Sequence, residues 1–161
     1  MNHARLSSVA AVLFLSSLCL SMAADSDGFI RIAPDQVTFK GTPAFSQAVL
    51  YGDPTKPGIY VVRVKFGPGV HTNPHTHSQD RFVTVIKGLW CMGVGDKVDE
   101  KALIPMTVGS FAVHPARAPH YDGACDEETI VQIMGMGPVD TVPLDSKAER
   151  TSLWKTPKAP N

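Results

Sequence analysis

The sequence predicts an all-β domain, an antiparallel sandwich or barrel of short strands. Thirteen glycines and thirteen prolines punctuate the 161 residues, and the segments between them are rich in valine and isoleucine. Glycine and proline favour turns, whereas β-branched residues favour strands. Regularly spaced short strands between such turns are typical of sandwiches and barrels. A chain of this length can bury one core, and no repeat or linker divides it.

The N-terminal segment has the pattern of a secretory signal peptide. Arg5 precedes a largely apolar stretch over residues 9–22, and no acidic residue occurs in either. Ser21 and Ala23 are the small residues that a signal peptidase accepts, so we expect cleavage near Ala23 or Ala24. The apolar stretch is too short for a comfortable membrane span. We therefore expect a periplasmic or secreted protein.

The predicted organisation is a signal peptide over residues 1–24 and a single domain over residues 25–161. The tail from residue 140 to 161 is polar and proline-bearing, with Trp154 as its large apolar anchor, so we expect it at the periphery. The formal net charge is zero and the charges are scattered. This excludes a basic nucleic-acid surface and gives no reason to expect membrane binding after signal cleavage.

The clearest strand runs from Ile59 to Phe66. Its apolar residues alternate with Arg63 and Lys65, as in a strand with one buried and one wet face. The predicted inward residues are Tyr60, Val62, Val64 and Phe66.

Further strands follow in order along the chain. Residues 81–87 continue a strand that carries His75 and His77, and Gly88 turns the chain so that residues 89–94 return as a hairpin partner. Residues 99–102 form a short helical turn, and shorter strands follow at 110–113 and 128–134. We expect the interior or the pocket mouth to be lined by Phe82, Val83, Val85, Trp90 and Phe111.

Two cysteines remain after signal cleavage, because Cys19 leaves with the signal peptide. In an oxidising compartment Cys91 and Cys125 can form one disulfide. The alternative is two unpaired thiols, and the sequence leaves both open. Neither cysteine belongs to a Cys-x-x-Cys pair, which argues against a thioredoxin-like role.

The histidines are the clearest candidates for a functional site in this sequence. His75 and His77 are two apart in an extended segment and therefore share a face. With His120 they form a predicted metal site, since neutral imidazole binds iron, zinc, copper or nickel at ~2.0–2.1 Å. His71 lies in a loop before Pro74, so we expect it to support the ligands from behind or to lie at the surface. His114 precedes Pro115, so we expect it at the rim.

The segments that carry these histidines resemble the two motifs of the cupin superfamily. The positions that match are Gly69, His75, His77 and Gly88 in the first motif, and Gly109, Pro115 and His120 in the second. Arg81 replaces the glutamate of the first motif, while Arg117 and Ala124 replace a glycine and an asparagine of the second. The resemblance covers residues 45–137 and implies a jelly-roll barrel, the double-stranded β-helix, with the histidines inside.

The arginine changes the ligand set that the resemblance implies, because a guanidinium has no lone pair for a cation. Strict alternation points Arg81 inward, where it contacts a substrate anion or is neutralised by Asp80; the alternative is an outward ion pair at the rim. Gln79 lies on the histidine face as a weak extra ligand, or a bulge brings Asp80 inward instead.

Three functions remain open at this stage. The histidine set resembles that of three-histidine dioxygenases, which implies an iron-dependent oxygenase acting on a small organic molecule. The alternatives are a non-catalytic metal- or ligand-binding protein, and a non-redox lyase or isomerase that uses zinc, manganese, nickel or another divalent transition metal. Cupins often pair through their outer sheets, so the resemblance also implies a homodimer.

Overall fold

The computed structural model of the chain describes residues 27–144 and 153–157, so the predicted signal peptide lies outside the described residues. The chain divides into two units, with the boundary between Arg31 and Ile32. In the first unit, Arg31 forms an ion pair with Asp27 at 2.9 Å and lies over the ring of Phe29. Everything that follows concerns the second unit.

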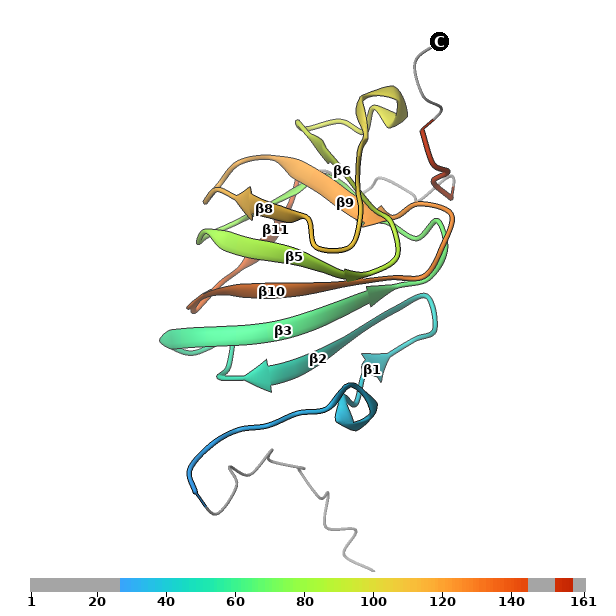
Figure 1. Cartoon of the computed structure of the whole chain (residues 1–161). Helices are drawn as coiled ribbons and strands as arrows, with labels where there is room; N and C mark the ends of the chain where they lie inside the picture. The colour runs from blue at the N-terminus through green and yellow to red at the C-terminus, as the bar shows by residue number, and fades with distance from the viewer. Residues whose placement is uncertain (1–26, 145–152, 158–161) are drawn as a thin grey trace, which may run out of the picture. The chain divides into compact units, whose positions relative to one another are not determined.

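The second unit is built from short strands and two 3-10 turns (Figure 1). The turns are η1 (Pro34–Gln36) and η2 (Glu100–Ala102). The strands are β1 (Lys40–Gly41), β2 (Phe45–Tyr51), β3 (Gly58–Phe66), β4 (His75–His77), β5 (Arg81–Lys87), β6 (Trp90–Val94), β7 (Ile104–Met106), β8 (Phe111–His114), β9 (His120–Ala124), β10 (Thr129–Gly137) and β11 (Thr141–Pro143). In the described part of the chain, no helix has the length and apolar character that a membrane crossing requires.

The strands form two antiparallel sheets. One has six strands in the order β1-β2-β3-β10-β5-β8, and the other has five in the order β11-β4-β9-β6-β7. In Figure 1, β3, β10 and β5 run side by side although β10 comes more than forty residues after β5 in the chain. The predicted all-β class is confirmed.

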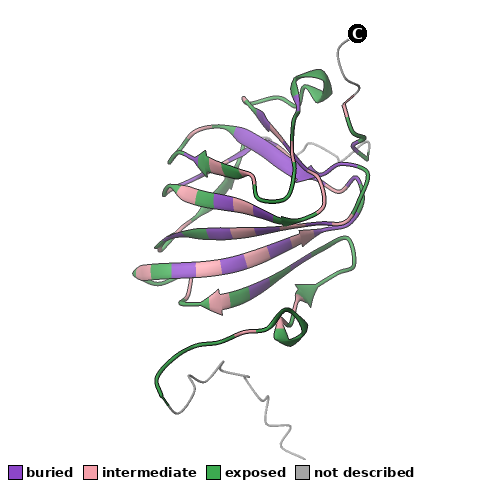
Figure 2. Cartoon of the chain, viewed as in Figure 1, coloured by how far each residue is buried: buried purple, intermediate pink, exposed green. Residues whose placement is uncertain are grey.

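The core lies between the sheets. Along β3 the buried residues alternate with more exposed ones, as the banding in Figure 2 shows, and the predicted inward set is confirmed: Tyr60, Val62, Val64 and Phe66. Val83 and Val131 join them from the same sheet, and Trp90 and Ala124 come from the other. Burying each large apolar side chain contributes about 1.5–3 kcal/mol, so this shared cluster holds the sheets together.

Two of the residues expected inside face outward instead. Val83, Val85 and Trp90 are buried as predicted, but Phe82 is 38% exposed and Phe111 is 59% exposed. The reason is the two-residue period of a strand: once Val83 and Val85 point inward on β5, Phe82 must point outward. On β8 the inward end position belongs to His114, which leaves Phe111 on the outer face.

The predicted hairpin after the histidine strand is also wrong. β4 and β5 do not form one strand, because the chain bends over residues 78–80 and passes from the five-stranded to the six-stranded sheet. β5 pairs with β10 and β8, whereas β6 pairs with β9 and β7. Gly88, with a φ of 77°, turns the chain back to the other sheet rather than into a hairpin.

Part of the C-terminal tail belongs to the sheet. β11 pairs with β4, with Thr141 opposite His77 and Pro143 opposite His75. Farther on, Trp154 is 1% exposed and stacks on His71 with 4.2 Å between the ring centroids. The tail therefore supports β4 through the pairing with β11, and it supports the loop before β4 through the contact of Trp154 with His71.

Cys91 and Cys125 form a disulfide. Cys91 lies in β6, Cys125 follows β9 directly, and their Cα atoms are 5.8 Å apart. β6 and β9 are neighbours in the sheet, with Trp90 opposite Ala124, so adjacent strands bring the two thiols together. The sequence left open a disulfide or two unpaired thiols, and the structure contains the disulfide.

Candidate metal centre

Two neighbouring strands bring three histidines together. β4 carries His75 and His77 on the same face, and His120 at the start of β9 is the register partner of His75. All three side chains are buried, and one ring nitrogen of each lies within 4.8 Å of the others. The structure thus places the predicted set at one point between the sheets.

Backbone carbonyls determine which ring nitrogen faces this point. Nδ1 of His75 lies 2.8 Å from the carbonyl oxygen of Asn73, and Nδ1 of His120 lies 2.9 Å from that of Ala118. Nδ1 of His77 lies 3.1 Å from the carbonyl oxygen of Asp140. A carbonyl oxygen only accepts, so each Nδ1 carries the proton and each neutral ring presents a lone pair on Nε2.

The spacing of the ring nitrogens suits a transition-metal ion. Nε2 of His75 and Nε2 of His77 are 3.1 Å apart. Two nitrogens that each lie ~2.0–2.1 Å from one ion are roughly 3.0–3.4 Å apart. Nε2 of His120 is buried without any hydrogen-bond partner. Metal-binding histidines typically donate their second ring N–H to a carbonyl or carboxylate, and here all three do so.

Burial favours the neutral form of two of these imidazoles, which is the state that binds a metal. Desolvation, with the charge of Arg81 as a second cause, lowers the pKa of His77 from 6.5 to about 2. Desolvation also lowers the pKa of His120. The rings of His77 and His120 are therefore held in the form that can bind a metal.

Arg81 enters the cluster from the opposite sheet. Its side chain is half-buried, and Nη1 lies 2.6 Å from Nε2 of His77. The inward orientation expected from alternation is what the structure has. No carboxylate forms an ion pair with the Arg81 guanidinium among the described residues, and its Nε is buried without a hydrogen-bond partner.

The expected weak oxygen ligand from Gln79 or Asp80 is not found at this site. Both residues lie in the bend between β4 and β5, where they are exposed. The Oδ1 atom of Asp80 accepts a hydrogen bond of 2.7 Å from the backbone N–H of Ala116. The bend that moves the chain between sheets therefore turns both side chains away from the histidines, and Asp80 does not neutralise Arg81.

Sequence reasoning missed two buried residues next to the cluster. His114 was expected at the rim, but it is 2% exposed and its ring centroid lies 3.9 Å from that of His120. His114, His120 and Asp122 form a second group that could hold a metal, and it shares His120 with the first. Desolvation lowers the pKa of His114 to about 4. The sequence could have predicted the position of Asp122, because a residue two positions after His120 in a strand lies on the same face as His120.

His71 lies apart from both groups of candidate ligands. It is buried, stacks on Trp154, and its Nδ1 lies 2.9 Å from the carbonyl oxygen of Thr72. The structure therefore gives His71 a packing role beneath the tail rather than an exposed position in a loop.

A cavity of about 150 Å³ opens beside the cluster. Its apolar wall comes mainly from β3 and β10 and consists of Phe45, Val64, Phe66, Val131 and Ile133. Its polar wall contains Gln47, Thr72, His75, His77, Arg81, Asp122 and Thr141. Such a mixed cavity next to candidate metal ligands suits a small organic molecule with one polar end.

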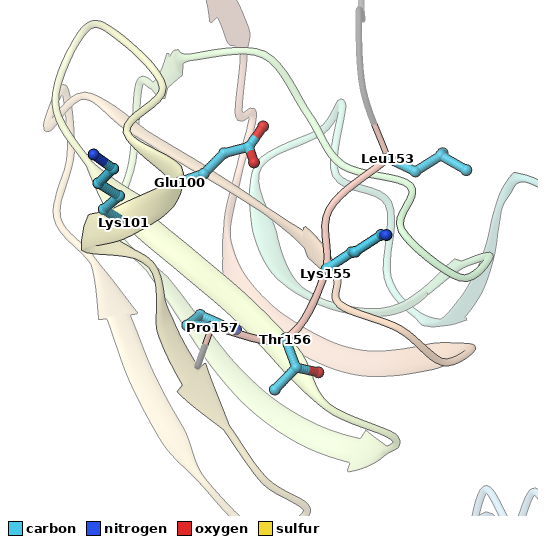
Figure 3. A pocket seen from close by; sticks show the side chains of 6 residues that line it. All are labelled: Glu100, Lys101, Leu153, Lys155, Thr156 and Pro157. Carbon is cyan, nitrogen blue, oxygen red and sulfur yellow. The ribbon is translucent and has the colours of Figure 1, made fainter. Parts of the chain in front are cut away.

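A larger pocket of about 520 Å³ lies elsewhere, between η2 and residues 153–157. Figure 3 shows its lining residues, which include Glu100, Lys101 and Lys155 but no histidine. Most of these side chains are exposed. Candidate metal ligands therefore line the smaller cavity and not the larger pocket.

Known structures share this architecture. KdgF from Halomonas sp. is 16% identical with a TM-score of 0.52, over 66% of this chain and 92% of that one. A RmlC-like cupin from Shewanella frigidimarina is 17% identical with a TM-score of 0.52, over 65% and 86%. The polyketide cyclase RemF from Streptomyces resistomycificus is 17% identical with a TM-score of 0.57, over 72% and 87%. No protein-family model and no curated protein matches the sequence.

Proposed function

Starting from the cupin fold of this chain, we propose that it is an exported metalloenzyme, an iron-dependent oxygenase that acts on a small organic anion. The observation that carries the proposal is the orientation of three buried imidazoles. Backbone carbonyls hold each Nδ1–H, so Nε2 of His75, His77 and His120 all present lone pairs to one point. Nε2 of His120 is buried without a hydrogen-bond partner, so its lone pair is available to a metal ion.

The donor set favours a catalytic over a structural metal site. Three neutral nitrogens leave coordination positions open, whereas a structural site is usually closed by four protein ligands. A divalent ion held there would supply Lewis-acid chemistry and, as iron, the capacity to bind dioxygen and substrate together. Iron is therefore the first candidate, and zinc, manganese, nickel and copper are the others.

The other residues of the cavity prepare the substrate. The Arg81 guanidinium, which no carboxylate neutralises among the described residues, orients an anionic group. The apolar wall that includes Val64, Val131 and Ile133 excludes water from the hydrocarbon part of the molecule. A cavity of about 150 Å³ limits the substrate to a few carbon atoms.

A non-redox reaction is the second candidate, and one comparison favours it. RemF, a neighbour in fold, is named a polyketide cyclase, and ring closure does not require dioxygen. In that case zinc, manganese or nickel would occupy the site and polarise a substrate oxygen. The identity of the metal therefore separates the two candidates.

The first experiment is elemental analysis of tag-free mature protein that is exported and purified without chelator. We expect close to one iron per chain, and oxygen consumption when small carboxylic acids are added. Stoichiometric zinc, manganese or nickel without oxygen uptake would support the non-redox candidate. A full metal site that turns over no compound would indicate a binding protein, and no metal after reconstitution would refute the proposal.

Export is tested separately from the chemistry. We expect the mature protein in the periplasm or the medium, with an N-terminus at Ala24 or Asp25 by mass spectrometry. An uncleaved chain in the cytoplasm would refute export without bearing on the metal site.

A further inference from the structure

We propose that Arg81 couples the metal site to an anion site: an incoming metal ion displaces its guanidinium from His77, and the freed guanidinium binds the carboxylate of a small monocarboxylic acid. The inference rests on the proposed metal site. It adds the chemical class of a second ligand and predicts that the two ligands favour each other's binding. The two sites then bind cooperatively, each ligand raising the affinity of the protein for the other.

The first step is a competition between two cations for the space beside His77. Nη1 of Arg81 lies 2.6 Å from Nε2 and 3.3 Å from Nδ1 of the His77 ring, so it contacts the ring without lying on the axis of the Nε2 lone pair. Nδ1 lies 3.1 Å from the carbonyl oxygen of Asp140, so Nε2 is the atom that would bind a metal. A metal ion on Nε2 would lie close to the guanidinium, and like charges repel strongly in a partly buried site. Metal binding to His77 therefore requires Arg81 to move.

The second step is the fate of the displaced guanidinium. Its Nε is already buried without a partner, and no carboxylate pairs with it in the described part of the chain. Losing the contact with His77 would leave a partly buried cation with fewer polar partners, which is costly. Arg81 also lines the small cavity, where an anion can supply the missing acceptors.

The cavity restricts which anion fits. At about 150 Å³ it holds a few carbon atoms beside a carboxylate. The wall across from the polar side chains is apolar and includes Phe66, Val131 and Ile133, which suits a short hydrocarbon tail. Asp122 is the other charged residue of the lining, and its carboxylate disfavours a second negative charge. A short monocarboxylate satisfies all three conditions.

Cooperativity follows from these steps. An anion that holds the guanidinium neutralises its charge and draws it away from His77, and so raises the affinity for metal. Because coupling free energies are reciprocal, a bound metal raises the affinity for the anion by the same factor. Removing the guanidinium removes the competitor, so it strengthens metal binding in the absence of anion. A residue with only a structural role would not have this last effect.

The test is calorimetric titration of metal-free protein with Co²⁺, with and without saturating propionate, in a buffer that does not bind metals. For the wild type we expect propionate to lower the Kd for Co²⁺ about tenfold. Arg81→Gln should bind Co²⁺ about tenfold more tightly than the wild type without propionate, and propionate should then have no effect. Arg81→Lys, which keeps the charge, should retain part of the coupling and guards against a folding defect in the first variant.

Four results would overturn the inference. If Arg81→Gln and Arg81→Lys both bind Co²⁺ no more tightly than the wild type, then the Arg81 guanidinium does not compete with the metal ion. Coupling of full size in Arg81→Gln would show that propionate acts through the metal alone. Wild type that binds Co²⁺ without any response to propionate would refute the coupling while leaving the proposed metal site intact, whereas no Co²⁺ binding by any form would refute both.

Discussion

Nη1 of Arg81 lies 2.6 Å from Nε2 of His77, the ring nitrogen that faces the other two histidines. The cupin motif that this chain resembles has a glutamate at the position of Arg81. The motif glutamate is thus replaced by a cation that contacts a candidate ligand. The exchange changes the charge at this point from negative to positive, and the groups that could hold a metal here are the histidines and Asp122.

Metal removal should lower thermal stability. An ion that binds only the folded chain stabilises it by about 2.7 kcal/mol when present at one hundred times its Kd. We therefore expect a chelator to lower the Tm by roughly 4 °C or more, measured by circular dichroism. His75→Ala should melt at the same temperature with and without chelator, because one of three ligands is missing.

His71→Ala is the matched control for that experiment. His71 is also buried, and it stacks on Trp154, so its removal should lower the Tm for reasons of packing. The difference between chelated and metal-loaded protein should nevertheless persist in this variant. If the difference in Tm between chelated and metal-loaded protein disappears in both His75→Ala and His71→Ala, then that difference does not depend on the metal ligands.

The stability of the metal-free protein should fall in mild acid. In the folded state the pKa of His114 is about 4 and that of His77 about 2, mainly because burial disfavours the charged rings. In the unfolded chain both titrate near ~6.5. Below that pH the unfolded state binds protons that the folded state does not, so the free energy of unfolding decreases as the pH falls.

Urea unfolding at several pH values between 7 and 4 measures this dependence on chelated protein. His114→Phe retains a buried ring but removes one titrating group, so its stability should fall less steeply over the same range. An unchanged slope in this variant would mean that His114 becomes protonated inside the folded protein.

Reduction of the Cys91–Cys125 disulfide should destabilise the fold. The bond closes a loop of 34 residues, which corresponds to about 4 kcal/mol of chain entropy in the unfolded state. We expect Cys91→Ser with Cys125→Ser to lower the free energy of unfolding by about 2–4 kcal/mol in denaturant titrations. A double variant as stable as the oxidised wild type would contradict this role.

The outer face of the six-stranded sheet should hold a homodimer together. Phe82 and Phe111 stack there with 6.4 Å between ring centroids, and Met134 is the register partner of Phe82. An exposed apolar face beside an edge strand favours association. We expect a dimer mass by light scattering, and a monomer for Phe111→Asp.

Ile104→Asp provides the comparison, since Ile104 is 58% exposed and Phe111 is 59% exposed, but Ile104 lies on β7 of the other sheet. This variant should remain dimeric. A monomeric wild type, or loss of the dimer in both variants, would refute the proposed interface.

The sequence predicted the inward face of β3 because alternation is a local property. It also paired His75 with His77, since a spacing of two in a strand puts side chains on one face, and His120 came from the second segment of the cupin resemblance. Phe82 was misplaced because it was expected inside together with its neighbour Val83, although alternation puts adjacent residues on opposite faces.

The sheet partners of β5 and β6 depend on contacts distant in the chain. Nothing in residues 81–94 shows that β10 will lie beside β5 or that β9 will lie beside β6. His114 was misplaced for the same reason: its burial follows from the pairing of β8 with β5, where it stands opposite Arg81. Long-range register, which the sequence does not display, therefore completes the site.

The pairing of β4 with β11 has a consequence for biogenesis. The strand that carries His75 and His77 is three residues long, and its partners are β9 and the much later Thr141–Pro143. The carbonyl that fixes the tautomer of His77 belongs to Asp140. A nascent chain that has not yet released residue 143 lacks these supports, so the proposed metal site would form only after the strand Thr141–Pro143 has been synthesised and has paired.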